Sequence, residues 1–458
     1  MLNRSRLCVN KILFPVLLLC LSLAASAQDN SPYSRYGLGD AVPNTNVSNR
    51  GMAGVSAGNA DLISINFSNP ASYSQFQTYV EQRTKRLTAG RAILDVGLNF
   101  DNRTLITPNT TQKFTSADAF FSYLQVGIPI RKNWGVSFGL RPLTRISYLI
   151  NRYERLSDPV TGLPIDSAIT QFKGSGGSYL PTIGTGFAIK NLSLGFNVGY
   201  LFGSRENSTL RSLINDSVLY YSSDHTTNTS FGNVFFNAGL QYVINLNNDK
   251  NKHTILRLGL AGNWQQTINA SQDILRQTFT RGSANEELQI DSVYQQSDVP
   301  GKIIYPAMYK GGFVVQRSNT DNSGWLFGAD YTTNKWSNYR YFGQADSVQD
   351  SWQVSVGAQI YPRPRMNYFS RVTYRFGFYA GSDYLHVQQK LPLIGGSFGV
   401  ALPITNYNRL SPNQFSVVNL AFEYGKRGDD NNLLKENLFR ISVGFNFTDL
   451  WFGKKKYE

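Results

Sequence analysis

Residues 192–202 read Leu-Ser-Leu-Gly-Phe-Asn-Val-Gly-Tyr-Leu-Phe, and this stretch decides the fold. Large apolar side chains alternate with small or polar ones along it. Because successive residues of a β-strand point to opposite faces, such a strand has one apolar and one polar face. The apolar face fits either the core of a soluble sandwich or lipid, and in the second case the polar face lines a lumen. The pattern recurs along most of the chain and predicts a transmembrane antiparallel β-barrel.

The alternation predicts about fourteen strands, an even number as in bacterial barrels. They are expected near residues 88–100, 117–131, 134–151, 178–189, 192–205, 230–246, 253–271, 305–317, 323–336, 349–361, 370–381, 393–404, 414–427 and 437–448. Short turns alternate with long polar connections, which are expected at residues 101–116, 152–177, 206–229 and 272–304. Short periplasmic turns and long external loops are typical of outer-membrane barrels, and this arrangement places both termini in the periplasm.

The first residues predict export. Arg4, Arg6 and Lys11 precede an apolar run over residues 13–23, and Ala25-Ser26-Ala27 is a typical cleavage site. We therefore expect a signal peptide over residues 1–27. A membrane anchor is disfavoured, because the apolar run is too short to span a bilayer.

The composition supports an exported barrel. The chain has 40 Gly, 26 Tyr and 29 Phe, and its only cysteines, Cys8 and Cys20, fall in the expected signal peptide. The mature chain then has no disulfide and no cysteine-ligated metal. The formal charge is +14, or +11 without the three cations of the signal peptide. For an exported barrel this excess indicates outer-membrane lipid headgroups or lipopolysaccharide as partners, or solvated basic loops, rather than nucleic acid.

The segment between signal and barrel has a different character. Residues 28–87 contain runs of Gly, Ala, Ser and Asn instead of alternating strands. A barrel of fourteen strands is too wide for its own side chains to fill, so either something fills the lumen or the barrel is an open pore. Small residues at this density allow the close backbone packing that a plug would need. We therefore predict an N-terminal hatch over residues 28–87, a barrel over 88–448 and a periplasmic tail over 449–458.

These features resemble the FadL family of outer-membrane transporters, which carry long-chain fatty acids and other hydrophobic compounds. The matching hatch residues are Gly51, Ala53, Gly54, Ala57, Asn69, Pro70 and Ala71. The opening Ser31-Pro32-Tyr33-Ser34-Arg35-Tyr36-Gly37-Leu38-Gly39 and the ending Asp449-Leu450-Trp451-Phe452 resemble Bacteroidetes-type members. The residues that bind a fatty-acid carboxylate in well-known members have no match here. The family also includes a shuttle subunit of type IX secretion.

Pro142 lies inside the expected third strand. Proline has no N–H for the ladder and is rare in central strands. The resemblance implies a kink here that opens a lateral exit from lumen to bilayer. A bulge without an opening is the alternative.

Three arginines are candidate lumen contacts: Arg141, Arg145 and Arg440. Together they would attract an acidic headgroup. Alternatively, they pair with lumen acids such as Asp330 or Glu423, which is the interpretation that we favour.

The sequence does not indicate an enzyme. His225, His253 and His386 show neither a catalytic cluster with Ser and an acid nor metal-ligand spacing. No cofactor is expected.

The leading interpretation is passive outer-membrane transport of a hydrophobic small molecule or lipid, such as a long-chain fatty acid, through a hatch-gated barrel with a lateral exit. The alternative is a structural or adaptor barrel subunit of an envelope secretion or assembly complex, similar to the type IX shuttle, whose partner is a protein complex.

Overall fold

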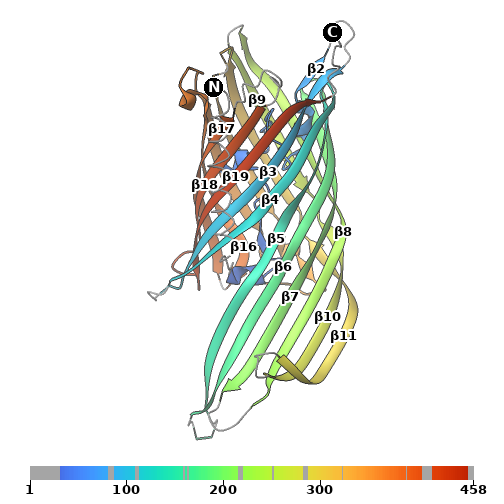
Figure 1. Ribbon diagram of the computed structural model, residues 1–458, viewed down its shortest axis with the longest axis vertical. Helices are drawn as coiled ribbons and strands as arrows, with labels where there is room; N and C mark the ends of the chain where they lie inside the picture. Colours follow the sequence, from blue (N-terminus) through green and yellow to red (C-terminus); the bar gives the residue numbers. More distant parts are fainter. Residues whose placement is uncertain are drawn as a thin grey trace, which may run out of the picture.

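The computed structural model describes residues 31–80, 87–108, 113–157, 160–161, 164–214, 220–249, 252–281, 287–321, 323–387, 389–404 and 415–451. Its wall is one antiparallel sheet that closes on itself, because the last strand pairs with the first strand of the wall from Lys435↔Ile106 to Trp451↔Gly90. Figure 1 shows the strands running obliquely around the barrel axis. The predicted signal peptide, residues 1–27, lies outside the described residues.

The wall consists of these strands: β3 (Leu87–Ile106), β4 (Lys113–Arg131), β5 (Trp134–Ser157), β6 (Pro164–Ile189), β7 (Leu192–Ile214), β8 (Ser222–Asp249), β9 (Lys252–Asn263), β10 (Gln266–Arg281), β11 (Glu287–Tyr305), β12 (Met308–Asn319), β13 (Gly324–Asn334), β15 (Ser351–Tyr361), β16 (Thr373–Val387), β17 (Gln389–Ile404), β18 (Phe415–Arg427) and β19 (Lys435–Trp451). The short elements are η1 (Pro32–Arg35), β1 (Asp40–Ala41), α2 (Val47–Arg50), η2 (Pro70–Gln75), β2 (Thr78–Val80), η3 (Trp336–Asn338), β14 (Arg340–Tyr341) and η4 (Tyr368–Arg371).

Two of the wall strands are each drawn as two pieces. β8 pairs with β9 along one half and with β10 along the other, so β9 and β10 are halves of one strand. β11 and β12 are separated at Pro306, which has no N–H to donate. Counted in this way the barrel has 14 strands, which confirms the predicted number.

The outer surface of the wall has two groups of aromatic side chains, as expected of a barrel in a membrane. Outward aromatic side chains gather near the short turns, at Trp134, Tyr242, Trp325 and Trp451. A second group lies farther along the strands, at Tyr200, Trp264, Tyr309, Tyr331 and Trp352. Two such girdles around an apolar band are typical of transmembrane barrels. We call the end with the turns 131–134 and 189–192 the short-turn end, and the opposite end the long-strand end.

The polar connections expected as long loops are mostly strand, which corrects the prediction. β5 and β6 remain paired out to Ser157↔Pro164, and β7 and β8 out to Arg211↔Ser223. Figure 1 shows β5–β8, β10 and β11 continuing as a curved sheet beyond the other strands. The alternation of apolar and polar residues did not indicate these strands, because the extension has polar residues on both faces and the prediction required one apolar face. Within the described residues, no helix has the length and apolar character needed to cross a bilayer.

Candidate functional site

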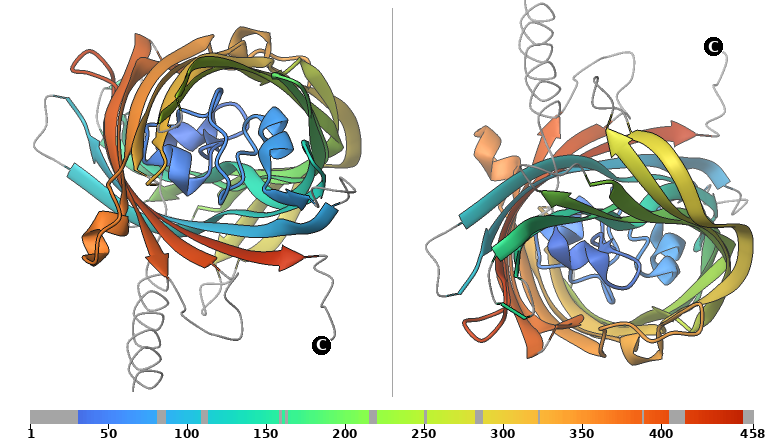
Figure 2. Two further views of the ribbon diagram at one scale, coloured as in Figure 1. Left: turned by 90° about the horizontal axis from the view of Figure 1, so that it is seen from above. Right: turned by 90° about the horizontal axis from the view of Figure 1, so that it is seen from below.

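The N-terminal segment lies inside the barrel. Figure 2 shows it in blue, enclosed by the ring of wall strands. We call residues 31–76 the hatch and its first part, residues 31–42, the strap. The remaining residues of the predicted hatch lead into β2 and β3, and residues 28–30 and 81–86 lie outside the described part of the chain.

Two short helices shape the hatch, and the local sequence explains where each begins. The side chain of Asn46 accepts a hydrogen bond from the N–H of Asn49 at 2.9 Å before α2. The side chain of Asn69 accepts one from the N–H of Ala71 at 3.1 Å before η2, and Pro70 is the first helical residue. Asn is a favoured N-cap and Pro a favoured first residue, so both starts are encoded locally.

The predicted glycine-rich run forms a tight turn against the wall. Ala53 and Gly54 have φ angles of 55° and 82°. Gly54 closes the turn by donating its N–H to the carbonyl of Asn49 at 2.9 Å. Gly51 lies against β17, where an added Cβ would come within 3.1 Å of the Cα of Gly399. Small residues here let the hatch backbone approach the wall closely.

Asn69 links the hatch to the wall. Its Nδ2 donates to the carbonyl of Ala57 at 2.7 Å and lies 3.3 Å from the carbonyls of Leu240 and Leu260, on β8 and β9. Pro70 and Ala71 lie against β7, where a Cβ on Gly195 would meet them at 2.2 and 2.3 Å. The structure thus places all seven predicted hatch residues inside the lumen.

A belt of wall glycines matches the hatch, although none of these glycines is among the predicted site residues. At each position an added Cβ would come within 3.0 Å of a hatch atom. This glycine belt comprises Gly127, Gly135, Gly186, Gly195, Gly239, Gly259, Gly328, Gly357, Gly377, Gly399 and Gly444, each on a different strand. The signal was present in the sequence, as a glycine on the lumen face of most predicted strands. Because the wall lacks side chains where the hatch backbone passes, the two surfaces are complementary.

Polar groups of the wall also hold the hatch. Asp330 of β13 accepts the N–H groups of Ser56 and Ala57 at 2.7 and 2.9 Å. Lys310 of β12 donates to the hydroxyl of Ser56 at 2.9 Å. Asp95 of β3 accepts the N–H of Ile65 at 3.0 Å. The two aspartates satisfy backbone N–H groups that have no strand partner, and removing these acceptors would leave buried donors unpaired.

An ion cluster fixes the strap. Its arginines are Arg103, Arg427 and Arg440, and its carboxylates are Asp40, Asp101, Asp383, Glu423 and Glu436. Asp40, on the strap, lies 2.7 Å from Arg103 and 3.1 Å from Arg427. Burial raises the pKa of Asp40, but these two guanidinium groups outweigh it and lower the pKa to about 2.

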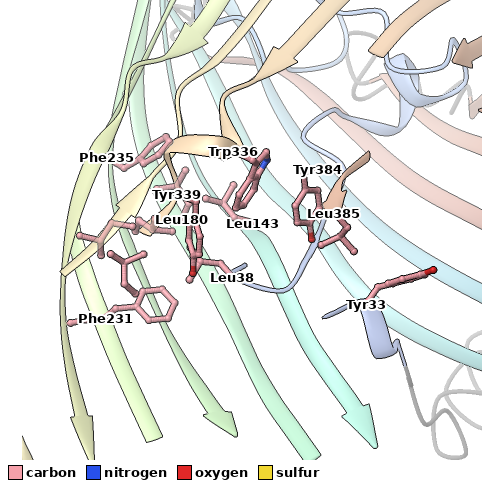
Figure 3. Packing of buried hydrophobic residues seen from close by; sticks show 14 of the residues in the cluster. Tyr33, Leu38, Leu143, Leu180, Phe231, Phe235, Trp336, Tyr339, Tyr384 and Leu385 are labelled. Carbon is pink, nitrogen blue, oxygen red and sulfur yellow. The ribbon is translucent and has the colours of Figure 1, made fainter. Parts of the chain in front are cut away.

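An apolar cluster lies beside the ion cluster (Figure 3). Leu38 of the strap packs with Leu143 of β5, Leu180 of β6 and Trp336 of η3. The rings of Trp336 and Tyr384 stack with their centroids 4.5 Å apart. The strap and the connection between β13 and β15 therefore pack together within the barrel. Passage along the axis would require this cluster to open.

A cavity within the lumen has a lining of both charged and apolar residues. It has a volume of about 390 Å³, and its lining includes Asp40, Arg50, Arg103, Lys310, Glu423 and Arg427. The lining also includes apolar side chains, among them Leu143, Trp336 and Tyr384, so polar and apolar groups both face this space.

The wall is split between β4 and β5. Their ladder ends at Leu124↔Leu140, and β5 continues without β4 through Pro142. β1 pairs with β5 instead, at Asp40↔Arg145 and Ala41↔Thr144. Leu140 lies six residues from Trp134 of the short-turn girdle, about 20 Å along the strand, so the split begins within the membrane thickness.

The three candidate arginines are not brought together. Arg145 forms an ion pair with Asp118 of β4 across the split. Arg440 lies 2.5 Å from Asp101 and 3.8 Å from Glu423. Arg141 is buried 5.2 Å from the ring of Phe67, and its Nη1 has no hydrogen-bond partner among the described residues. The structure therefore favours pairing for Arg145 and Arg440. Asp330 binds the hatch instead of any of the three.

The described residues contain no group of three or more His, Cys, Asp or Glu suited to a metal ion.

Comparisons with known proteins identify a family and a fold. A family model described as BamG matches residues 8–458. The structure of a Pseudomonas aeruginosa FadL homologue has a TM-score of 0.52 and 12% identity, over 91% of this chain and 100% of that chain. The CymD monoaromatic hydrocarbon channel has a TM-score of 0.46 and 14% identity, over 90% and 98% of the two chains. The Ralstonia pickettii toluene transporter TbuX has a TM-score of 0.46 and 13% identity, over 88% and 98%.

Among curated proteins, none matches the sequence. At these identities the likeness to the FadL homologue is one of fold.

Proposed function

This chain belongs to the BamG family and has the fold of a FadL homologue, and from these premises we propose that it is an outer-membrane barrel that carries hydrophobic small molecules. The short-turn end faces the periplasm, with both termini, and the extended sheet faces outward. The outward aromatic side chains then contact the two lipid leaflets, the outer one bordered by lipopolysaccharide. The molecule carried is an apolar compound such as a long-chain fatty acid.

The split between β4 and β5 carries this proposal. A sheet edge cannot remain unpaired in hydrocarbon, because its N–H and C=O groups would lack partners. Here β1 of the strap supplies partners to β5 beyond Leu140. When the strap leaves, a gap opens from the lumen to the bilayer beside Pro142. A hydrophobic molecule then leaves sideways, without crossing the cavity of the lumen to the opposite end.

The strap is therefore the gate in this proposal, and the rest of the hatch is a fixed plug. Residues 46–76 are held by the glycine belt, whereas the strap is held by side chains that can separate without moving the wall. The pairing across the split between Asp118 and Arg145 would break when the gap opens.

A reversible cross-link tests the route. Asp118→Cys and Arg145→Cys, in a background with Cys8→Ser and Cys20→Ser, place one thiol on each side of the split. A cleavable bismaleimide then holds the split closed in proteoliposomes. We expect uptake of a fluorescent long-chain fatty acid to fall and to recover when the linker is cleaved.

The matched control joins Thr226→Cys to Leu275→Cys, which already face each other in the intact ladder between β8 and β10. This link should leave uptake unchanged. Full transport by the linked Asp118–Arg145 variant would refute the lateral route.

The packed lumen and the extended sheet favour a second function, that of a structural or adaptor subunit of an envelope secretion or assembly complex. The extension has an exposed edge at β11, where Leu288, Ile290 and Val293 face solvent. In-register shortening of the β10–β11 hairpin beyond Leu275↔Gln295 would remove this edge without entering the membrane. Loss of a stoichiometric co-purifying protein, with transport intact, would support the adaptor function.

A further inference from the structure

The connection between β15 and β16 carries an exposed apolar patch. Residues 362–371 read Pro-Arg-Pro-Arg-Met-Asn-Tyr-Phe-Ser-Arg and include η4. Met366 is 98% exposed, Phe369 65% and Tyr368 45%. Figure 2 shows the orange helix of this connection outside the ring of strands, away from the lumen. Large apolar side chains gathered at one exposed site indicate a contact surface.

The segment has a defined shape. The hydroxyl of Ser370 accepts the N–H of Arg365 at 2.8 Å and donates to the carbonyl of Asn367 at 2.6 Å. The hydroxyl of Tyr368 donates to the carbonyl of Pro403 on β17 at 3.3 Å, and that of Tyr374 donates to the carbonyl of Phe369 at 3.1 Å. These bonds fold the segment sideways across neighbouring strands, so the apolar side chains are presented by an ordered support.

Cations surround the patch. Arg363 pairs with Asp321 at 2.6 Å, while Arg365 and Arg371 have no carboxylate partner among the described residues. The other turns of this end add Arg131, Lys132, Lys190 and Lys252, which are exposed. The surface that the patch shares is therefore cationic, which favours an anionic partner.

The height of residues 362–371 relative to the short-turn girdle indicates that this anionic partner is lipid. It begins two residues after Ile360, which faces outward opposite Trp325 of the short-turn girdle. Aromatic girdles lie at the headgroup level of the bilayer. Apolar side chains flanked by arginines at this level match a surface that enters the headgroup boundary and binds phosphates.

We propose that residues 362–371 form a lipid-binding element, in which Met366, Tyr368 and Phe369 enter the leaflet at the short-turn end and Arg365 and Arg371 bind the phosphates of anionic phospholipids. This holds for a transporter and for an adaptor alike, because the element lies outside the lumen and away from the extended sheet. It would fix the rotation and tilt of the barrel relative to the membrane.

The first test places a probe. Met366→Cys, in the Cys8→Ser and Cys20→Ser background, is labelled with an environment-sensitive NBD group and the barrel is reconstituted in vesicles of phosphatidylethanolamine and phosphatidylglycerol. We expect a blue-shifted emission that headgroup-level spin-labelled lipid quenches. Val293→Cys, at an apolar residue that is 72% exposed on the extended sheet, is the matched control and should remain water-like. An equally water-like probe at position 366 would refute insertion and leave a protein partner or a second copy as the occupant.

The second test measures lipid preference. Arg365→Gln with Arg371→Gln should lower the preference for bound phosphatidylglycerol over phosphatidylcholine, measured by native mass spectrometry, by roughly tenfold. Lys132→Gln with Lys190→Gln removes the same charge from other turns of this end and should have a smaller effect. Equal losses in the two double variants would show a general surface charge and overturn a site at residues 362–371. Heat-modified migration of all variants reports that the barrel is folded.

Discussion

Asp40 and Arg103 are joined by an ion pair of 2.7 Å, although they lie 63 positions apart in the chain. The pair connects the strap to β3, and Arg427 extends it to β18. The strap also donates the hydroxyl of Tyr33 to the carbonyl of Leu434, 401 positions away, at 2.6 Å. These contacts hold the strap across the split by side-chain chemistry that single substitutions can remove.

Asp40→Asn should release the strap. The substitution removes a buried charge and leaves Arg103 and Arg427 with fewer partners, so it should destabilise strap docking by about 3–5 kcal/mol. Limited proteolysis or hydrogen exchange of residues 31–42 would measure this, with the exchange of β15 as a control. Unchanged protection of the strap would show that the apolar cluster alone holds it.

The effect of Asp40 should depend on pH. Its folded pKa of about 2 lies below its ordinary value of 3.8, so its stabilisation is fully present above about pH 4 and is lost as the pH falls through about 2. Hydrogen exchange of the strap in the native protein and in Asp40→Asn should therefore differ at pH 6 and converge near pH 2. A difference that persists below pH 2 would assign the effect to another group.

The glycine belt should tolerate no side chain. In Gly259→Ala the new Cβ would lie 1.9 Å from the carbonyl oxygen of Ala57, so the hatch must move. We expect a loss of roughly 1–3 kcal/mol in unfolding free energy and raised ion conductance in planar bilayers. Gly396→Ala is the control, because its Cβ would meet only the carbonyl oxygen of Gly377, at 3.6 Å. Equal behaviour of the two variants would contradict close packing of the hatch.

The free-energy cost of an outward arginine should show where the membrane ends along the strands. Leu260 faces outward on β9 between Tyr242 and Trp264 of the two girdles, and Leu260→Arg should cost about 2–4 kcal/mol in folding titrations with lipid. Ile290→Arg, on the extended sheet, should cost within about 0.5 kcal/mol of zero, because the side chain stays in water. A comparable cost at both sites would show that the extended sheet is covered.

Pro142→Val should lengthen the ladder between β4 and β5. Valine supplies the missing N–H and favours strand, so the residues after Leu140 gain protection from hydrogen exchange. The variant should fold at least as well as the native protein and carry the fluorescent fatty acid more slowly. Ion conductance should stay unchanged, because the hatch is intact. Native transport by a variant with a demonstrably longer ladder would exclude an exit beside Pro142.

The periodic part of this fold could be predicted from the sequence. The strand count and the lipid-facing side chains follow from alternation, which each strand encodes locally. The extended sheet could not, because β10 and β11 beyond the membrane meet water on both faces and lose the apolar signal. The density of small residues in the hatch also predicts a plug.

The contacts that position the site were less accessible. The glycine belt depends on which wall residue faces which hatch atom, and Asp40, Arg103 and Arg427 come from distant parts of the chain. Pairing of Arg145 and Arg440 with lumen acids could be predicted, but most of the partners could not: Glu423 lies near Arg440 as expected, whereas Asp101 and Asp118 are not among the acids expected from the sequence. Pro142 was informative because its chemistry limits its neighbours whatever the pairing is.

The glycine belt also constrains the order of assembly. A plug that fits this closely would have to make and break wall contacts along its whole path to enter a finished barrel from one end. Packing of residues 46–76 while the seam between β3 and β19 is still open avoids this barrier. On this route the wall strands close around an N-terminal segment that is already folded, so the hatch acts as a template for the barrel during insertion into the membrane.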